Sequence, residues 1–198
     1  GAQESIRYDA KPHIGTDVLI RVVTELRKEI LDRGGEVRFQ TKMTELVTEN
    51  GEVSGVRVRQ GDREEVLSCR HVILAIGHSS RDTFEELYRK GIPMEPKAFS
   101  MGVRIEHLQK SINEAQYGPQ NLKLPAADYS LNIHLPDGTS AYTFCMCPGG
   151  YVVAAASEEG GVVTNGMSYS GRSGENANAA LLVTLQPEDF PDKSVLGG

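Results

Sequence analysis

Residues 71–77 (His-Val-Ile-Leu-Ala-Ile-Gly) form an almost continuous apolar run that ends on glycine. Strands with one solvent-exposed face alternate apolar and polar residues, whereas a run without alternation is typical of a strand buried on both faces of a parallel sheet. Ser79, followed three residues later by Asp82, predicts the start of a helix, and we expect that helix to end near Gly91. A buried strand, a glycine turn and a helix in this order predict an α/β unit.

The sequence before this run predicts one long helix and several short strands. Apolar residues recur at helical spacing from about Thr16 to Arg33, and Gly34-Gly35 favours the end of the helix there. Asn50-Gly51 favours a hairpin turn. Strands or extended segments are expected at residues 36–41, 43–47, 53–58 and 65–67.

The second half of the chain changes character near Pro93 and Pro96 and indicates mainly antiparallel β structure. Strands are expected at residues 100–106, 130–134, 139–147, 151–156 and 162–167. Short helices are expected at 109–116 and 176–184. We therefore predict a fold of the class α/β plus mainly antiparallel β, with an α/β domain at 1–95 and a β-rich domain at 96–198.

Composition and charge narrow the classes of partner. The 198 residues carry a formal net charge of −6, which argues against a nucleic-acid or anionic-membrane partner. No apolar run approaches the roughly 20 residues needed to span a bilayer. Three cysteines, Cys69, Cys145 and Cys147, are too few for a disulfide framework and favour a reducing, cytoplasmic location. The N-terminus resembles no secretory signal, and without an initiator methionine we expect a segment of a longer protein.

The glycine that ends the apolar run has two interpretations. Gly77 lets a ligand approach the backbone closely, and dinucleotides bind at the carboxyl ends of parallel strands. The same glycine is also consistent with a turn that only connects a strand to a helix. The residues of this segment alone leave both interpretations open.

Cys145 and Cys147 are two residues apart on an expected strand, so both thiols would point to one face. They are candidates for a substrate pocket, as a redox-active or substrate-contacting pair, and the alternative is two inert thiols in a sheet core. A direct disulfide between them would be strained. A metal would need more soft ligands, and His134 is the only candidate near in sequence, so we expect no metal site.

Arg172 and Asn176 follow a glycine-rich turn and are further candidates for the substrate pocket. The arginine could clamp a carboxylate or phosphate at the start of the helix expected at 176–184. Alternatively, these residues only cap that helix and carry solvated charge. Arg104 and Glu106 lie on one face of an expected strand and could simply pair across the sheet.

Several longer motifs carry a resemblance to known proteins. The glycine pair at 34–35 with the strand after it, a hairpin, and the run at 72–77 resemble the middle of the FAD domain of two-dinucleotide-binding-domain flavoproteins. Further motifs are Lys-Pro-His-Ile-Gly-Thr-Asp at 11–17, Met-Gly-Val-Arg-Ile-Glu-His at 101–107, Cys-Met-Cys-Pro-Gly-Gly at 145–150, and Asn-Gly-Met-Ser at 165–168 with Arg172 and Asn-Ala-Asn at 176–178. These resemble the uncharacterised FAD-dependent (NAD-utilising) dehydrogenase family.

The resemblance implies FAD as the cofactor and places individual residues near it. Met43 would lie near the adenine, and Ala75, Gly77 and His78 would lie near the ribose and diphosphate. The implied reaction is hydride transfer between the flavin and a small-molecule substrate or NAD(P)H. Lysine and histidine of the motif at 11–17 would face the flavin.

One motif of that family does not occur in this sequence. The Gly-x-Gly-x-x-Gly turn, which seats the pyrophosphate at a helix N-terminus, is absent. The resemblance therefore implies an internal fragment, with a partial FAD/NAD(P)-binding-like (Rossmann-like) domain followed by an inserted β-rich substrate-side domain. We expect such a fragment to retain no flavin and to be inactive alone. Its partners would be the missing N- and C-terminal parts of its own parent chain, or a second copy that pairs with the exposed edge at 72–76.

Two other classes of function remain open from the sequence. A non-catalytic domain that binds a nucleotide or a protein would also contain an α/β unit without a phosphate-binding turn. A lobe with only a structural role would have the same features. Bound flavin in the longer protein would distinguish the enzyme from both alternatives.

Overall fold

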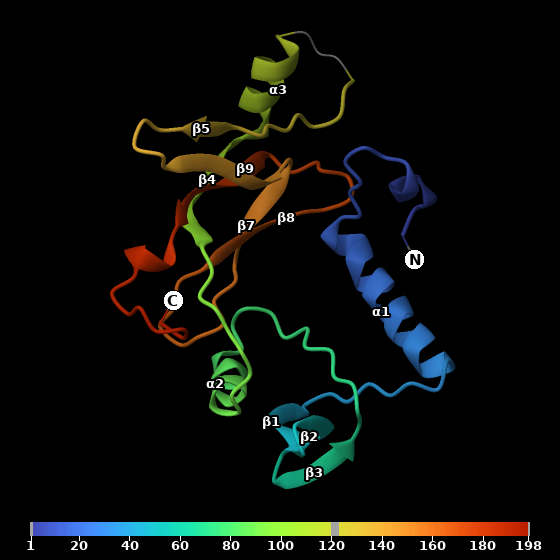
Figure 1. The fold of residues 1–198 in the computed structure, drawn as a ribbon. Coiled ribbons are helices and arrows are strands. Elements are labelled where there is room, and N and C mark those ends of the chain that lie inside the picture. The colour runs from blue at the N-terminus through green and yellow to red at the C-terminus, as the bar shows by residue number, and fades with distance from the viewer. Residues whose placement is uncertain (1, 120–122, 198) are drawn as a thin grey trace. The chain divides into compact units, whose positions relative to one another are not determined.

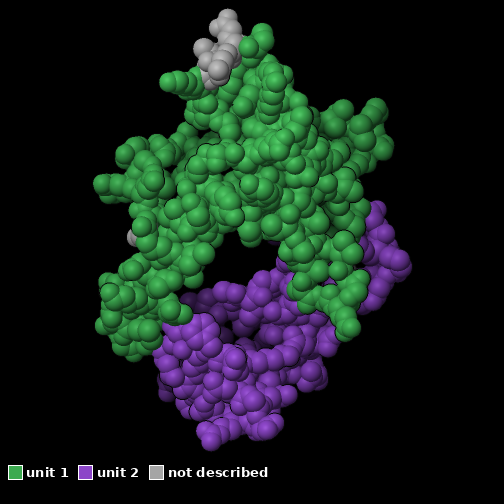
Figure 2. Space-filling view, turned by 180° about the vertical axis from the view of Figure 1, so that it is seen from behind, with its two compact units in different colours: residues 1–35, 98–185 green, residues 36–97, 186–198 purple. Residues whose placement is uncertain are grey.

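The computed structural model describes residues 2–119 and 123–197 (Figure 1). The chain forms two compact units (Figure 2): unit 1 contains residues 1–35 and 98–185, and unit 2 contains residues 36–97 and 186–198. The elements in chain order are η1 (Glu4–Arg7), α1 (Thr16–Asp32), β1 (Lys42–Glu49), β2 (Glu52–Gln60), β3 (Arg63–Ser68), α2 (Arg81–Arg89), β4 (Phe99–Leu108), α3 (Gln109–Tyr117), β5 (Asn132–His134), β6 (Ser140–Cys147), β7 (Gly150–Ala154), β8 (Thr164–Ser168), β9 (Asn176–Leu185) and η2 (Pro187–Asp189).

Unit 1 contains a four-stranded antiparallel sheet in the order β4-β9-β6-β5, with the last strand of the chain, β9, between two earlier ones. β9 pairs with β4 along its whole length, from Phe99 opposite Leu185 to Leu108 opposite Asn176. Ala177 and Ala179 on β9 are fully buried. A second sheet, formed by β7 and β8, pairs Gly150 with Ser168 at one end. The mainly antiparallel character expected for this half is confirmed.

The prediction of a helix at 176–184 is wrong, because these residues form β9. Alanine and leucine favour helix locally, but the preference is below about 1 kcal/mol per residue. In the sheet, β9 instead forms hydrogen bonds with β4 on one side and β6 on the other. Tertiary pairing therefore outweighs local propensity. The other predicted strands of this half correspond to β4–β8, and the short helix predicted at 109–116 is α3.

A β-bulge interrupts β6 beside β9. Phe144 lies opposite Ala180 and Cys147 lies opposite Asn178, so two residues of β6 face one residue of β9. Cys145, at the bulge, has a φ of +46°, a conformation that side chains other than glycine seldom adopt. The bulge gives the two thiols of this motif different environments.

Helix α1 begins at Thr16 and ends at Asp32, as its apolar spacing predicts. Gly34, with a φ of +80°, follows its end. None of its residues is buried, and the exposed fraction of Ile20 is 73%. Helix α1 belongs to the same compact unit as residues 98–185, whereas the predicted boundary near residue 95 places it in the other part of the chain. Compact units are not the same as domains, so the division into domains at 1–95 and 96–198 stays a prediction.

Unit 2 contains the antiparallel sheet β1-β2-β3, with α2 packed against β1. The predicted hairpin turn is confirmed, since Asn50 and Gly51 both have positive φ, at 53° and 83°. A small apolar core contains Leu46 and Val58 from the sheet and Leu87 from α2. The helix predicted after Ser79 is also confirmed.

Two strands predicted in unit 2 do not form. Residues 36–41 contain a turn at Phe39 and Gln40, the latter with a φ of +54°, and β1 begins only at Lys42. Residues 71–77 belong to no helix and pair with no strand in the described part of the chain. The exposed fraction of Ile73 is 93%. A strand requires a hydrogen-bonding partner, so an apolar pattern alone cannot create one.

Candidate functional site

The start of α1 docks on the segment that follows β8, and both segments lie in unit 1. Asp17 accepts hydrogen bonds from Ser170, to Oδ1 from the backbone N–H (2.7 Å) and to Oδ2 from the hydroxyl (2.6 Å). These bonds hold the pKa of Asp17 below its ordinary value. Thr16 Oγ1 donates to the Ser168 carbonyl at 3.3 Å, and His13 Nε2 donates to the Tyr169 carbonyl at 3.0 Å. The motif at 11–17 therefore contacts the motif that begins at Asn165.

The loop Pro148-Gly149-Gly150 packs against the same segment. Ser168 Oγ donates to the Pro148 carbonyl at 2.9 Å, and Gly174 N–H donates to the Gly149 carbonyl at 3.1 Å. Gln109, buried at the start of α3, accepts from Gly149 N–H at 2.8 Å. A Cβ at Gly149 would lie 1.9 Å from the Arg172 carbonyl oxygen. Only glycine allows the two segments to approach this closely.

Arg104 on β4 forms hydrogen bonds with two other motifs, the one at 145–150 and the one at 176–178. Its Nη1 donates to Asn178 Oδ1 at 2.7 Å and to the Cys145 carbonyl at 3.2 Å. β8 crosses this cluster at Gly166, where a Cβ would lie 2.3 Å from Asn178 Oδ1, 2.5 Å from Arg104 Nη1 and 2.7 Å from Cys147 Sγ. Four motifs that are far apart in the sequence thus meet within unit 1.

The two cysteines of this cluster differ in environment. Cys147 is half-buried, and its Sγ donates to the Cys145 carbonyl at 3.3 Å, whereas Cys145 is exposed on the bulge. Burial raises the pKa of the Cys147 thiol, and the charge of Arg104 opposes this only in part. The thiol therefore stays protonated near neutral pH and lacks the thiolate that a nucleophile requires. Both cysteines are free thiols.

Arg172 lies in the connection between β8 and β9, and Asn176 begins β9, so neither residue stands at the start of a helix. Arg172 has a φ of +48°, and its N–H donates to the Tyr169 carbonyl at 3.0 Å, which closes a turn. Its Nε is buried and has no partner among the described residues. Asn176 is the first residue of β9, opposite Leu108. The interpretation of these residues as caps of a helix is wrong, because no helix begins there.

The four residues expected near FAD lie on two elements of unit 2. Met43 is half-buried on β1, opposite Val58. Ala75, Gly77 and His78 are exposed on the unpaired segment. Gly77 has a φ of +70°, and no atom lies within 4 Å of the position of its Cβ. Space is therefore open beside the backbone at this glycine.

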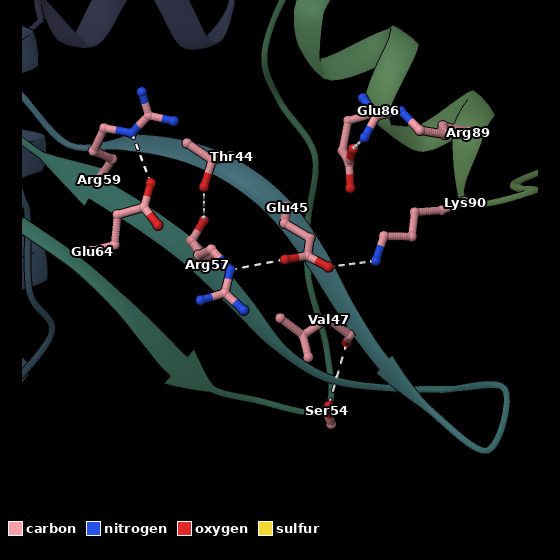
Figure 3. A network of polar contacts seen from close by, with 10 residues as sticks. All are labelled: Thr44, Glu45, Val47, Ser54, Arg57, Arg59, Glu64, Glu86, Arg89 and Lys90. Carbon is pink, nitrogen blue, oxygen red and sulfur yellow. Dashed lines mark hydrogen bonds and ion pairs between the residues drawn. The ribbon is translucent and has the colours of Figure 1, made fainter.

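A polar network on β1, β2 and α2 supports the fold of unit 2 (Figure 3). Glu45 accepts hydrogen bonds from Arg57 Nε at 2.8 Å and from Lys90 Nζ at 2.5 Å. The hydrogen bonds from Arg57 and Lys90 lower the pKa of Glu45 to about 2. Arg59 and Glu64 form a further ion pair at 2.9 Å. This network joins the end of α2 to the sheet.

Sequence reasoning missed Gln109, which holds the unit 1 cluster together, and it gave Ser168 only as a member of the motif at 165–168, with no role. Gln109 donates through Nε2 to the Ala127 carbonyl at 3.0 Å and to Asn113 Oδ1 at 2.8 Å, besides its bond to the loop at 148–150. A buried glutamine at a strand–helix junction is the type of residue that satisfies loop backbone groups. Asn113 is only four residues away, but Ala127 and Gly149 are 18 and 40 residues away, so spacing offers no signal for the contact with the loop.

Family models identify the class of the chain as that of the flavoproteins. A model described as "FAD-dependent protein, C-terminal domain-like" matches residues 98–198, and a model described as "FAD binding domain" matches residues 5–116. The chain belongs to the family of FAD-dependent proteins that these models represent. FAD is the cofactor that both descriptions name.

A curated relative extends well beyond this chain. An uncharacterised protein of Clostridium beijerinckii is 49% identical over 201 residues. The alignment covers 100% of this chain and 37% of the relative's length. No helix in the described ranges 2–119 and 123–197 is long and apolar enough to cross a membrane. The same residues contain no group of three or more His, Cys, Asp or Glu side chains placed to hold a metal.

Proposed function

We propose that this chain is part of a FAD-dependent oxidoreductase, in which the flavin exchanges a hydride with a small-molecule substrate or with NAD(P)H. The observation that carries the proposal is the match to two FAD family models, which together extend from residue 5 to residue 198. FAD supplies the hydride chemistry when it is bound, and the protein binds and orients the reactants. This chain would contribute part of the FAD-binding lobe and one wall of the substrate pocket.

The residues of the unpaired segment suit contact with a dinucleotide. Ala75, Gly77 and His78 are exposed, and the backbone of 71–77 forms no ladder with a described strand. Open space beside Gly77 allows a ribose or a diphosphate to approach the main chain. These features support FAD at this position. They also support the view that the full site needs further residues around it.

The remaining parts of a longer protein are the partner that we propose for the run at 72–76. An apolar segment with Ile73 at 93% exposure gains free energy when it is covered, at roughly 25 cal/mol per Å² of apolar surface. A homodimer through the same run is the alternative. Sedimentation of the 198-residue chain over micromolar concentrations separates the two, because a dimer would form in the chain alone and dissociate on dilution.

The flavin absorbance of the chain and of the longer protein tests the proposed function. After incubation with FAD and desalting, we expect flavin on the longer protein and none on the 198-residue chain. Loss of the flavin colour on addition of NADH or NADPH would identify a nicotinamide co-substrate. Flavin on neither protein would contradict the proposal and favour a non-catalytic binding domain.

A matched pair of glycine variants in the longer protein sharpens the test. Gly77→Val should lower the retained flavin several-fold, because a branched side chain would block the approach to the backbone. Gly61→Val is the control, since Gly61 also has positive φ (59°) and no atom within 4 Å of its Cβ position. Equal flavin retention in both variants would contradict the assignment of Gly77 to the FAD site.

A further inference from the structure

Arg104 is a half-buried arginine whose hydrogen-bond partners are all neutral. Its Nη1 donates to the Asn178 side-chain oxygen and to the Cys145 carbonyl, at 2.7 and 3.2 Å. No carboxylate of the described residues forms an ion pair with it, including Glu106 two residues further along β4. The guanidinium is always charged in a protein. Its positive charge is therefore held in place without a counterion from the described chain.

The same cluster contains buried hydrogen-bond donors that have no acceptor among the described residues. Asn178 is fully buried, and its Nδ2 has no partner among the described residues. Arg104 Nε is buried and likewise without a described partner. A buried donor without an acceptor destabilises the folded state, because it loses its hydrogen bonds to water and gains none in return. Both donors belong to residues that contact each other directly, so the unsatisfied donors are concentrated at one place in unit 1.

Cys147 completes one side of the cluster without adding charge. It lies opposite Asn178 in the pairing of β6 with β9, so both side chains share one face of the sheet. Burial raises the pKa of its thiol, which stays neutral beside Arg104. Arg172, in the connection from β8 to β9, adds a second buried Nε without a described partner. The local charge is positive.

We propose that Arg104 and Asn178 form a binding site for a small oxyanion, a carboxylate or a phosphate, on the β4–β9–β6 face of unit 1. Asn178 Oδ1 holds Nη1 and so fixes the plane of the guanidinium, which leaves the Nε–Nη2 edge for the ligand. That edge is a planar pair of donors whose spacing matches two oxygens of a carboxylate or phosphate. The site consists of this chain's own residues, and none of them is among the four residues expected near FAD.

Calorimetric titration of the protein with acetate, and separately with inorganic phosphate, tests the site and distinguishes the two ligands. We expect saturable binding of at least one of them, weakened about tenfold or more by Arg104→Gln, since a charge-assisted hydrogen bond contributes about 1.5–3 kcal/mol. Arg59→Gln is the matched control, because it also removes one positive charge from a strand but leaves this cluster intact.

Asn178→Asp gives a second test that keeps the shape of the side chain. The new carboxylate would lie at the oxygen that already contacts Arg104 and would supply the missing counterion. We expect this variant to stay folded, with unchanged circular dichroism, and to lose binding of the external anion.

Three results would overturn the proposal: no anion binding by the unsubstituted protein, equal weakening by Arg104→Gln and Arg59→Gln, or unchanged binding by Asn178→Asp. None of these measurements uses flavin. A longer protein that binds the anion but never retains FAD would therefore contradict the proposed function and leave this site standing.

Discussion

The start of α1 in unit 1 and the run at 71–77 in unit 2 both belong to motifs of one flavoprotein family, yet their environments are opposite. Asp17 forms two hydrogen bonds with Ser170, at 2.7 and 2.6 Å, from a residue 153 positions away. Ile73 is 93% exposed, and its segment pairs with no described strand. The motif at 11–17 is held by contacts inside this chain. The run at 71–77 has the apolar pattern of a buried segment, but the described residues do not cover it.

The largest loss of stability is expected from a substitution at the place where the motifs of unit 1 meet. Gly149→Ala should lower the free energy of unfolding of unit 1 by about 3 kcal/mol or more, because the new Cβ would overlap the Arg172 carbonyl and Gly149 has a φ of +53°. Gly138→Ala, at an open turn with a φ of +87°, should cost about 1 kcal/mol. Hydrogen exchange of the β9 amides measures both. Equal losses would show that the contact with Arg172 contributes nothing.

A smaller effect is expected in unit 2, where a buried and an exposed apolar residue can be compared. Leu87→Ala should cost about 2–4 kcal/mol, because Leu87 is buried between α2 and the sheet. Ile73→Ala should change the stability of this chain by less than about 0.5 kcal/mol. In a longer protein that covers the run, Ile73→Ala should become costly. Chemical denaturation of both proteins measures the difference, and a small cost in the longer protein would mean that the run stays uncovered.

The smallest effect is expected in the polar network of unit 2. The pKa of Glu45 is lowered to about 2 from an ordinary value of 4.5, so its contribution to stability is present above pH 4.5 and is lost as the pH falls toward 2. Glu45→Gln should remove this part of the acid dependence, seen as a flatter denaturation midpoint between those pH values. Glu52→Gln, at a residue without a described ion pair, is the control. An unchanged pH profile in Glu45→Gln would contradict the role of the network.

Local signals in the sequence predict local structure well. The spacing of apolar residues predicts α1, and Asn50-Gly51 predicts the hairpin, because each depends on neighbours within a few positions. The alanines and leucines of β9 predict a helix, because they favour one locally and the two partner strands lie far away in the sequence. The apolar run at 71–77 predicts a strand from a burial pattern that the described residues do not satisfy.

The candidate site could be predicted only as separate motifs. Each of Arg104, Cys147 and Arg172 can be assigned to its own strand or turn, but nothing in the sequence places Arg104 against Asn178. Gln109 belongs to none of the motifs, and Ser168 ends the motif at 165–168 without a recognisable role; the role of each follows from the loop backbone groups that it satisfies. Long-range hydrogen bonds between side chain and backbone are set by packing, which periodicity does not encode.

The position of β9 in its sheet has a consequence for synthesis of the protein. β4 and β6 both pair with β9, which follows them in the chain, and β4 pairs with no other described strand. During translation, β4 therefore remains unpaired until the chain has emerged from the ribosome as far as Leu185. The hairpin of β5 and β6 can already form before that point. Sheets that depend on such distant pairings close slowly. The contact between Arg104 and Asn178 forms at the same late step, so a nascent chain acquires its cluster of motifs only when the last strand of the sheet is inserted.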